Sequence, residues 1–257
     1  MNRLSSVAFA TLAAATVAAF FVTQHLKVTT PLIQGNPSPD PPAINPVDGK
    51  VCAGVNHRFT RLSFYLQHRA DDVDVYVVDS GGEIIRTVAS DHHMRRNVRN
   101  PDGEFSWNGR EDKGAVAPDG TYYFEVALHN QGRTVELSNT PVKVITVAPR
   151  PVVTRVSPSL ARDGEPVAIS YSGGAGRGAT VLLYRTDLSG GPRLAFWFGT
   201  GNPHRVVWNG RIRGRPAPAG TYLVALRVTD AACNSATYPP VLPPAAGAAP
   251  NAVVNIR

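Results

Sequence analysis

The chain has 257 residues, of which 26 are Lys or Arg and 19 are Asp or Glu, so its formal net charge is +7. A basic balance of this size suits contact with cell-wall polymers, lipid headgroups or nucleic acid, and it is also a common means of staying soluble. The 22 Pro and 23 Gly punctuate short runs rich in Val, Tyr and Thr, and no long apolar stripe of helical period follows residue 27. These features exclude a helical bundle and predict an all-β chain.

Residues 4–22 form an uncharged apolar run between Arg3 and Lys27. Its length matches one bilayer-spanning helix. A cleavable signal peptide is the alternative, but the small residues at 13–15 lie inside the run rather than behind it, so we favour an uncleaved transmembrane anchor within residues 1–27. We therefore expect a single-pass protein of the cell membrane with an extracytoplasmic body, or a secreted protein if the segment is cleaved.

Residues 28–50 predict a spacer. The segment is too rich in Pro to pair in a sheet and too poor in bulky residues to build a core, so we expect an extended, partly polyproline II linker that holds the body away from the membrane. About two hundred residues then remain, which suits two domains of ordinary size. We place these domains at residues 51–148 and 149–257.

Alternation of apolar and polar residues predicts half-buried strands in both domains. Residues 72–78 place three valines on one face and two aspartates and a tyrosine on the other. The sequence Asp-Ser-Gly-Gly at 79–82 then indicates a hairpin turn. Residues 122–128 and 222–228 each begin with Tyr and continue with an apolar residue at every second position. The inward face of this strand is therefore predicted twice.

One motif occurs twice, about a hundred residues apart, and such a self-match indicates two copies of one domain. In each copy a Trp suited to a sandwich interior precedes Asn-Gly-Arg, a Pro-x-Gly turn follows, and a Tyr opens the next strand as in the tyrosine corner of immunoglobulin-like domains. We interpret these residues as determinants of the fold rather than as a ligand pocket. They are Trp107, Asn108, Gly109, Arg110, Pro118, Gly120 and Tyr122, and Trp208, Asn209, Gly210, Arg211, Pro218, Gly220 and Tyr222.

This motif resembles the FlgD-type immunoglobulin-like domain, named for the flagellar hook-capping protein, in which Trp-Asp-Gly-Arg precedes a Pro-x-Gly-Thr-Tyr turn. The resemblance covers both copies and implies two tandem immunoglobulin-like β-sandwiches, similar to fibronectin type III modules, behind one N-terminal hydrophobic helix. Asn108 and Asn209 stand where the family often has Asp. Nothing in the chain resembles the amino-terminal hook-assembly part of the capping protein, so no flagellar role is carried over.

Two surface features are candidates for binding. Arg95, Arg96 and Arg99 lie in a segment that joins two strands, where they would serve to dock an anionic polymer or a partner, with an ordinary solvated loop as the alternative. In the run Phe-Trp-Phe at 196–198, alternation sends Trp197 to the face opposite its neighbours. An exposed Trp197 would be able to stack on a sugar, whereas a buried one would remove that support.

The chain has two cysteines, Cys52 and Cys233. In an oxidising compartment a disulfide between them would staple the start of the first domain to a late loop of the second. Two separate thiols are the alternative, because the sequence does not show whether the Cα atoms come within about 7 Å of each other.

Motifs of catalysis are absent: there is no Gly-x-Ser-x-Gly, His-Glu-x-x-His, Walker loop or dinucleotide fingerprint. The adjacent His92 and His93 point to opposite sides of an extended chain, and Asp72 and Asp74 fall on a solvent face, so we expect no metal and no cofactor. The sequence thus predicts a non-catalytic, membrane-tethered protein with a structural or adhesive role toward a cell-envelope polymer or protein partner, and no nucleic acid. A carbohydrate-binding or accessory module of a cell-surface enzyme system is the alternative.

Overall fold

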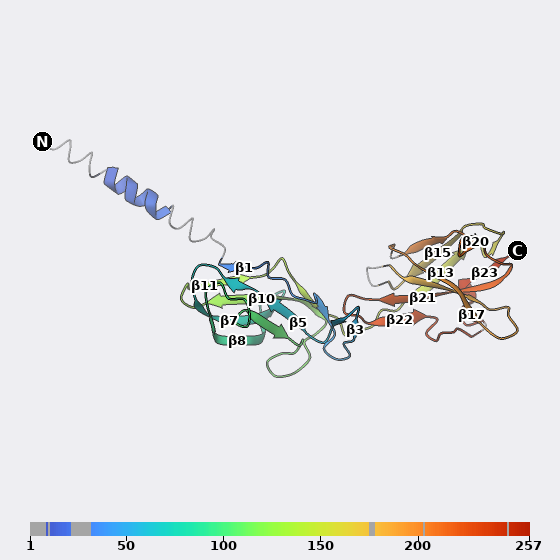
Figure 1. The fold of residues 1–257 in the computed structure, drawn as a ribbon, viewed down its shortest axis with the longest axis horizontal. Helices are drawn as coiled ribbons and strands as arrows, with labels where there is room; N and C mark the ends of the chain where they lie inside the picture. The colour runs from blue at the N-terminus through green and yellow to red at the C-terminus, as the bar shows by residue number, and fades with distance from the viewer. Residues whose placement is uncertain (1–8, 10, 22–31, 175–177, 203, 246) are drawn as a thin grey trace.

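The computed structural model describes residues 9, 11–21, 32–174, 178–202, 204–245 and 247–257. A helix covers residues 11–21, and two β-sandwiches follow one another along the long axis of the molecule (Figure 1). The helix lies within the predicted anchor, whose other residues are mostly outside the described ones. Among the helices that the described residues form, none combines the length and the apolar character that crossing a bilayer requires.

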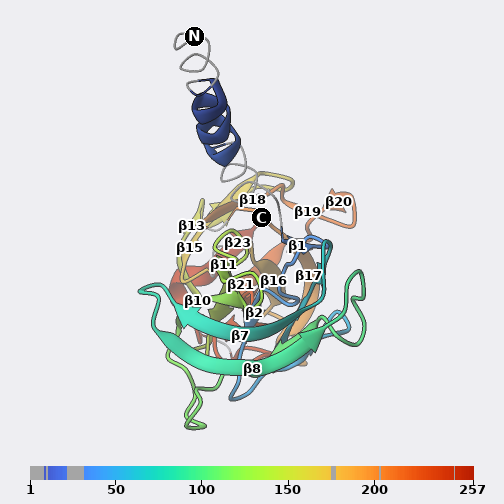
Figure 2. The same cartoon turned by 90° about the vertical axis from the view of Figure 1, so that its left-hand side faces the viewer.

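The first sandwich contains the strands from residue 33 to residue 144. These strands are β1 (Ile33–Gln34), β2 (Ala43–Ile44), β3 (Val51–Cys52), β4 (Val55–Asn56), β5 (Thr60–Ser63), β6 (Tyr65–Leu66), β7 (Asp71–Asp79), β8 (Ile84–Met94), β9 (Glu104–Trp107), β10 (Gly120–Leu128), β11 (Arg133–Glu136) and β12 (Val142–Val144). The main sheet has the order β2-β12-β10-β7-β8, and β11 also pairs with β10. The opposite layer contains β5 paired with β9. Figure 2 shows β7 and β8 crossing the end of the molecule that faces the viewer.

The core of the first sandwich lies between these two layers, as the strand alternation predicts. On β7, Val73, Val75 and Val77 are fully buried, and Asp72 and Asp74 alternate with them on the opposite face. Each valine stands opposite an apolar residue of β10, for example Val75 opposite Val126. The predicted inward face of residues 122–128 is therefore confirmed.

The second sandwich contains the strands from residue 152 to residue 256. These are β13 (Val152–Ser157), β14 (Leu160–Ala161), β15 (Val167–Ser172), β16 (Thr180–Arg185), β17 (Arg193–Gly199), β18 (Arg205–Trp208), β19 (Arg211–Ile212), β20 (Arg215–Pro216), β21 (Gly220–Thr229), β22 (Ser235–Tyr238) and β23 (Val253–Ile256), with a 3-10 turn η1 (Pro250–Ala252) before the last. Its main sheet has the order β14-β23-β21-β16-β17, and β22 also pairs with β21. The opposite layer has the order β13-β15-β18.

The two main sheets repeat each other strand for strand. In both, the first strand of the order pairs in parallel with the second, β2 with β12 and β14 with β23. The remaining neighbours are antiparallel, and the edge strands β8 and β17 occupy equivalent places. The tandem repeat predicted from the duplicated motif is thus confirmed at the level of topology.

The duplicated motif makes the same contacts in both copies. The indole N–H of Trp107 donates to the carbonyl of Arg110 at 2.9 Å, and Trp208 donates to Arg211 at 2.8 Å. The Tyr122 hydroxyl donates to the carbonyl of Pro118 at 2.7 Å, and the equivalent bond of the second copy is 2.8 Å long. Both indoles are almost fully buried. Because the polar atoms of Trp and Tyr are already bonded within each turn, these residues hold the corner of the sandwich together.

The structure corrects the prediction that residues 28–50 form a spacer. Ala43, Ile44 and Asn45 are buried, and β2 adds an outer strand to the main sheet. The first sandwich therefore begins before residue 51. The prolines had argued against pairing, but they fall between the short paired segments rather than inside them. The part of the segment up to residue 31 lies outside the described residues.

A disulfide between Cys52 and Cys233 joins the two sandwiches, with the Cα atoms 6.1 Å apart. Beside it, the Asn45 side-chain amide donates to Asn234 Oδ1 at 2.7 Å, and the Asn234 amide donates to the carbonyl of Ile145 at 2.9 Å. Both asparagines are buried. The junction is therefore held by one covalent bond and by satisfied buried amides, which fix the relative position of the sandwiches.

Candidate functional site

The arginines of the predicted docking loop are all engaged within the first sandwich. Arg95 forms a two-bonded ion pair with Asp102, with N–O distances of 2.8 and 3.0 Å. Arg96 donates to the carbonyl of Gln67, and Arg99 donates to the carbonyl of Gly35. Hydrogen bonds from Arg95 lower the pKa of Asp102 to about 2. These contacts hold the loop against the sandwich, and the charge of Arg95 is paired with that of Asp102, although all three arginines remain exposed.

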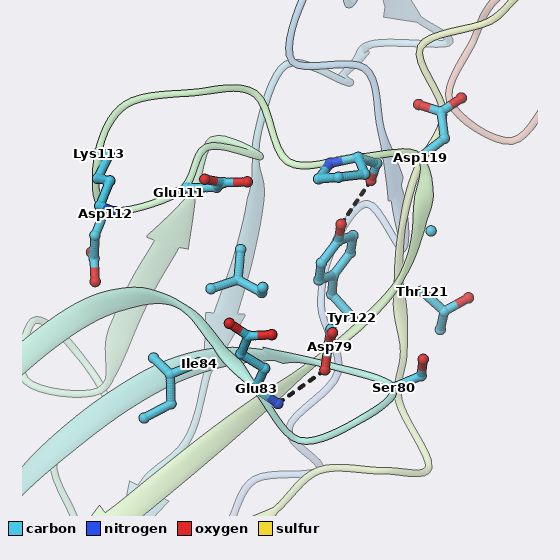
Figure 3. Close-up of a pocket in the computed structure, with 13 residues that line it drawn as sticks. Asp79, Ser80, Glu83, Ile84, Glu111, Asp112, Lys113, Asp119, Thr121 and Tyr122 are labelled. Carbon is cyan, nitrogen blue, oxygen red and sulfur yellow. Dashed lines mark hydrogen bonds between the residues drawn. The ribbon is translucent and has the colours of Figure 1, made fainter.

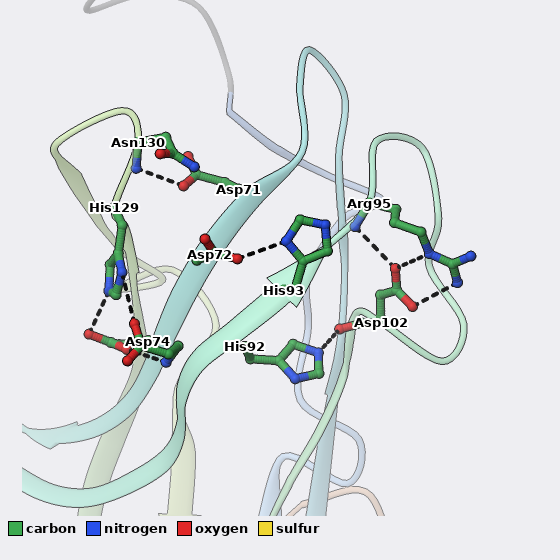
Figure 4. A network of polar contacts seen from close by, with 10 residues as sticks. Asp71, Asp72, Asp74, His92, His93, Arg95, Asp102, His129 and Asn130 are labelled. Carbon is green, nitrogen blue, oxygen red and sulfur yellow. Dashed lines mark hydrogen bonds and ion pairs between the residues drawn. The ribbon is translucent and has the colours of Figure 1, made fainter.

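A polar network covers the outer face of the first sandwich (Figure 4). His93 pairs with Asp72 at 2.7 Å, and His129 pairs with Asp74 at 2.9 Å. His129 also lies 3.2 Å from Asp91. The hydrogen bond to Asp74 raises the pKa of His129, and the same bond lowers the pKa of Asp74.

The side chains of Asp74, Asp91 and His129 offer three ligand atoms within 4.8 Å of one another. The atoms that meet in this group already pair with each other, and Asp91 is a highly exposed member. These contacts hold the β7–β8 hairpin against the loop after β10.

An acidic cavity of about 620 Å³ opens at the other end of the first sandwich (Figure 3). Asp79 and Asp119 line it together with Glu83, Glu111 and Asp112. Two of these carboxylates accept hydrogen bonds that stabilise the local backbone. Asp79 accepts hydrogen bonds from the backbone N–H groups of Gly81 and Glu83. Asp119 accepts hydrogen bonds from the backbone N–H and the hydroxyl of Thr146. Turn formation accounts for these two carboxylates, and Lys113 lines the cavity beside them.

Charge is divided unequally between the sandwiches. Residues 149–257 hold 12 of the 26 basic residues but 4 of the 19 acidic ones, so their net charge is +8 and that of residues 1–148 is −1. Among the described residues, the second sandwich has one salt bridge, between Arg185 and Asp187. Its other described arginines therefore face solvent without a carboxylate partner. The excess of positive charge in this chain therefore lies in residues 149–257.

Arginines and aromatic residues meet at the side of the second sandwich where β17 and β18 form the edges of their sheets. A cavity of about 290 Å³ there is lined by Phe196, Phe198 and Val207, with Arg211 and Arg213 from the β19–β20 hairpin. Trp197 points to the opposite face of β17 and is 62% exposed, whereas its two neighbours pack against the core. The structure therefore places an exposed indole and two arginines without a carboxylate partner among the described residues on one edge of the sandwich, with Arg211 donating to the carbonyl of Gly214.

Sequence reasoning pointed to Trp197 but missed the contrast between the two basic loops. The loop of Arg95 and the hairpin of Arg213 look equally basic in the sequence. The difference arises because Asp102 pairs with Arg95 in the first loop, whereas the described residues that line the cavity beside the second loop include no acidic one. Counting the charged residues in each half of the chain would have revealed this contrast from the sequence.

One family model matches part of the first sandwich. Residues 57–132 match the family model of the FlgD Ig-like domain. No curated protein matches the chain. Among solved structures, the chain is similar to a tetra-tandem repeat in the extending region of a large adhesion protein, with 18% identity, a TM-score of 0.30, and coverage of 76% of this chain and 46% of that one. It is also similar to a marsupial T cell receptor, with 9% identity, a TM-score of 0.43, and coverage of 87% and 72%.

The chain thus spans less than half the length of the adhesion-protein repeat structure. The family match falls on the strands from β5 to β10 that carry the Trp-Asn-Gly-Arg corner of the first sandwich. The second sandwich has the same strand order and the same corner contacts. Residues 57–132 thus match the FlgD Ig-like domain, and the chain carries a second sandwich of the same architecture behind them.

Proposed function

We propose that this protein is a non-catalytic adhesive or scaffolding protein of the cell envelope, which holds the basic second sandwich against an anionic envelope polymer. The observation that carries the proposal is the division of charge, −1 in residues 1–148 and +8 in residues 149–257. A surface with one sign of charge attracts a polyanion over distances set by ionic screening. The FlgD Ig-like family match is compatible with a structural module.

The junction between the sandwiches supports this role. A polymer-binding module acts as an adhesive only if tension on the polymer reaches the rest of the chain. The bond between Cys52 and Cys233 transmits such tension past the intervening strands, because it connects the beginning of one sandwich to the end of the other. A disulfide is also suited to an oxidising, extracytoplasmic compartment.

Tethering through residues 4–22 is the second part of the proposal. The apolar composition of this run supports it. Fractionation of cells that express the full chain, followed by protease treatment of intact cells, tests it. The tethered arrangement requires the protein to stay in the membrane fraction and its sandwiches to be accessible from outside. Recovery of the whole chain in the medium would show instead that the segment is removed.

Polymer binding is tested with the full chain in detergent and a purified anionic cell-wall polymer, with a neutral dextran as the control ligand. Arg211, Arg213 and Arg215 are changed together to Gln, and Arg95, Arg96 and Arg99 are changed together in a matched variant with the same loss of charge. We expect the first triple variant to lose at least ten-fold in affinity and the second to lose little. We also expect binding to weaken between about 0.1 and 1 M salt, where the screening length falls from about 10 to 3 Å. Equal effects of the two variants would contradict the proposed surface.

A carbohydrate-binding role is a second candidate, because Trp197 is exposed. An indole face stacks on the apolar face of a sugar ring without any need for charge. Trp197→Ala should abolish such binding to a neutral glycan and leave the salt-dependent binding of the anionic polymer unchanged. The two candidates are therefore separated by one variant and two ligands.

A further inference from the structure

The edge strands β8 and β17, which occupy equivalent places in the two main sheets, differ in whether a loop covers their outer edge. In the first sandwich, the edge of β8 is capped by the loop that follows Trp107: the backbone N–H of Asp112 donates to the carbonyl of Ile85 at 3.2 Å, and the N–H of Thr87 donates to Asp112 Oδ1 at 3.0 Å. Arg86 also donates to the carbonyl of Glu111. The loop therefore satisfies edge groups that a neighbouring strand would otherwise satisfy.

The equivalent loop of the second sandwich leaves its edge strand uncovered. Asp112 follows Trp107 by five residues, and the residue five places after Trp208 is Arg213, which has a positive φ of 51° in the turn of the β19–β20 hairpin. A guanidinium group cannot accept a hydrogen bond from a backbone N–H. Within the described part of the chain, no hydrogen bond beyond the β16–β17 ladder involves Trp197 or Gly199.

The register shows which backbone groups of β17 point away from the sheet. The N–H of Thr200 donates to the carbonyl of Ala179 at 2.9 Å, and Phe198 stands opposite Val181. Hydrogen-bonded and non-bonded pairs alternate along an antiparallel ladder. The N–H and C=O groups of Trp197 and Gly199 are therefore directed outward, where they can bond to one further strand.

The surroundings of this edge are suited to a strand with particular side chains. The cavity of about 290 Å³ beside it is lined by Phe196, Phe198 and Val207, so it accepts apolar side chains at alternate positions. Arg211 and Arg213 line the same cavity and have no carboxylate partner among the described residues. Because these arginines and the phenylalanines lie on the same side of the edge, the residues of an incoming strand that face the cavity, every second one, would be apolar beside the phenylalanines and acidic beside the arginines.

We propose that the β17 edge of the second sandwich accepts an extended peptide segment of a partner protein, in which the residues that face the cavity include both apolar and acidic ones. Backbone bonds to Trp197 and Gly199 provide affinity, and the cavity and its arginines select the side chains, as in other cases where a peptide adds a strand to a sheet edge. A second copy of this chain fits less well, because pairing two β17 edges brings arginines of like charge together. This inference concerns a protein partner and does not depend on binding of the envelope polymer.

The test uses the full chain in detergent and a fluorescently labelled peptide, acetyl-(Val-Thr-Glu-Thr)2-amide, in which Val and Glu share one face of the extended strand, with acetyl-(Val-Thr-Lys-Thr)2-amide as the control. Binding is followed by fluorescence anisotropy, and amide hydrogen exchange is measured by NMR. We expect the acidic peptide to bind at least ten-fold more tightly than the basic one. It should slow exchange at the amides of Trp197 and Gly199 and leave β8 unchanged.

Gly199→Pro is the decisive variant, because it removes an outward N–H and leaves the β16–β17 ladder intact; proline is tolerated on a strand edge of this kind. Gly199→Ala keeps the N–H, and the new methyl group has open space around it. We expect the proline variant to lose at least ten-fold in affinity and the alanine variant to bind like the wild type. Arg213→Asp should also weaken binding of the acidic peptide, which provides a second readout should the proline variant unfold.

Three results would overturn the proposal. The first is equal affinity of the proline and alanine variants. The second is peptide protection at a place other than β17. The third is sedimentation that shows a dimer which Gly199→Pro dissociates, because the occupant of the edge would then be a second copy of the chain.

Discussion

Breaking the disulfide between Cys52 and Cys233 tests whether the two sandwiches behave as one body. The cysteines are separated by 181 residues in sequence. The chain-entropy relation for a cross-linked loop gives about 5 kcal/mol at 25 °C for unfolding of the whole of this loop. If only one sandwich unfolds, its chain of roughly a hundred residues stays attached to the folded sandwich both through the disulfide and through the chain itself. For a closed loop of this length the same relation gives a stabilisation of about 4.7 kcal/mol.

We therefore expect the Cys52→Ser/Cys233→Ser variant to lose about 4–5 kcal/mol of unfolding free energy, measured by guanidinium denaturation with tryptophan fluorescence. The hydrogen bonds described at the junction join Asn45 to Asn234 and Asn234 to Ile145, and each contributes about 1 kcal/mol. Without the covalent bond this junction is weak. Small-angle scattering should consequently show a broader distribution of distances between the sandwiches.

The wild-type chain under reducing conditions is the matched control and should behave like the double variant. Before reduction, a thiol reagent added to the unfolded wild-type chain should modify neither cysteine. A double variant with the wild-type denaturation midpoint and an unchanged scattering profile would refute the reasoning, because surface contacts rather than the bond would then hold the sandwiches together.

Three further predictions concern the first sandwich. Tyr122→Phe removes the hydroxyl that bonds to a carbonyl of the preceding turn, and it should lower the unfolding free energy by about 1 kcal/mol in a denaturant titration; no change would show the bond to be dispensable. The pKa of His129 is raised by its bond to Asp74, so its stabilising effect is complete below the unfolded pKa and is lost as pH rises through the folded pKa. An NMR titration should give a pKa above 6.5 in the wild type and a lower one in Asp74→Asn; identical values would contradict this pairing. Arg95 lowers the pKa of Asp102 to about 2. The stabilising effect of this ion pair is therefore present above the ordinary carboxyl pKa and is lost as pH falls toward 2. Acid should consequently release the loop at a higher pH in Arg95→Gln than in the wild type.

The architecture could be predicted because its determinants are local. Trp107, the Asn-Gly turn and Tyr122 each act within about fifteen residues of one another, and their duplication gave a second, independent observation of the same unit. The phase of the central strand was predictable for the same reason, since alternation is a property of neighbouring residues.

Features that depend on distant partners could not be predicted. Ile44 pairs with a strand a hundred residues later, so its burial was hidden by the prolines around it. Arg95 and Arg99 looked free because their acceptors, Asp102 and the carbonyl of Gly35, come close only in the folded loop. Whether an edge is capped depends on the path of a neighbouring loop, which in the first sandwich is fixed by Asp112.

The uncovered edge of β17 also bears on whether copies of this protein associate with one another. An exposed strand edge is a template on which further chains can pair and aggregate. Arg211 and Arg213 give every copy the same charge beside that edge, so at low ionic strength two edges repel each other. Screening by salt weakens this repulsion. The two arginines thus oppose pairing between the β17 edges of two copies, and this protection is strongest at low salt.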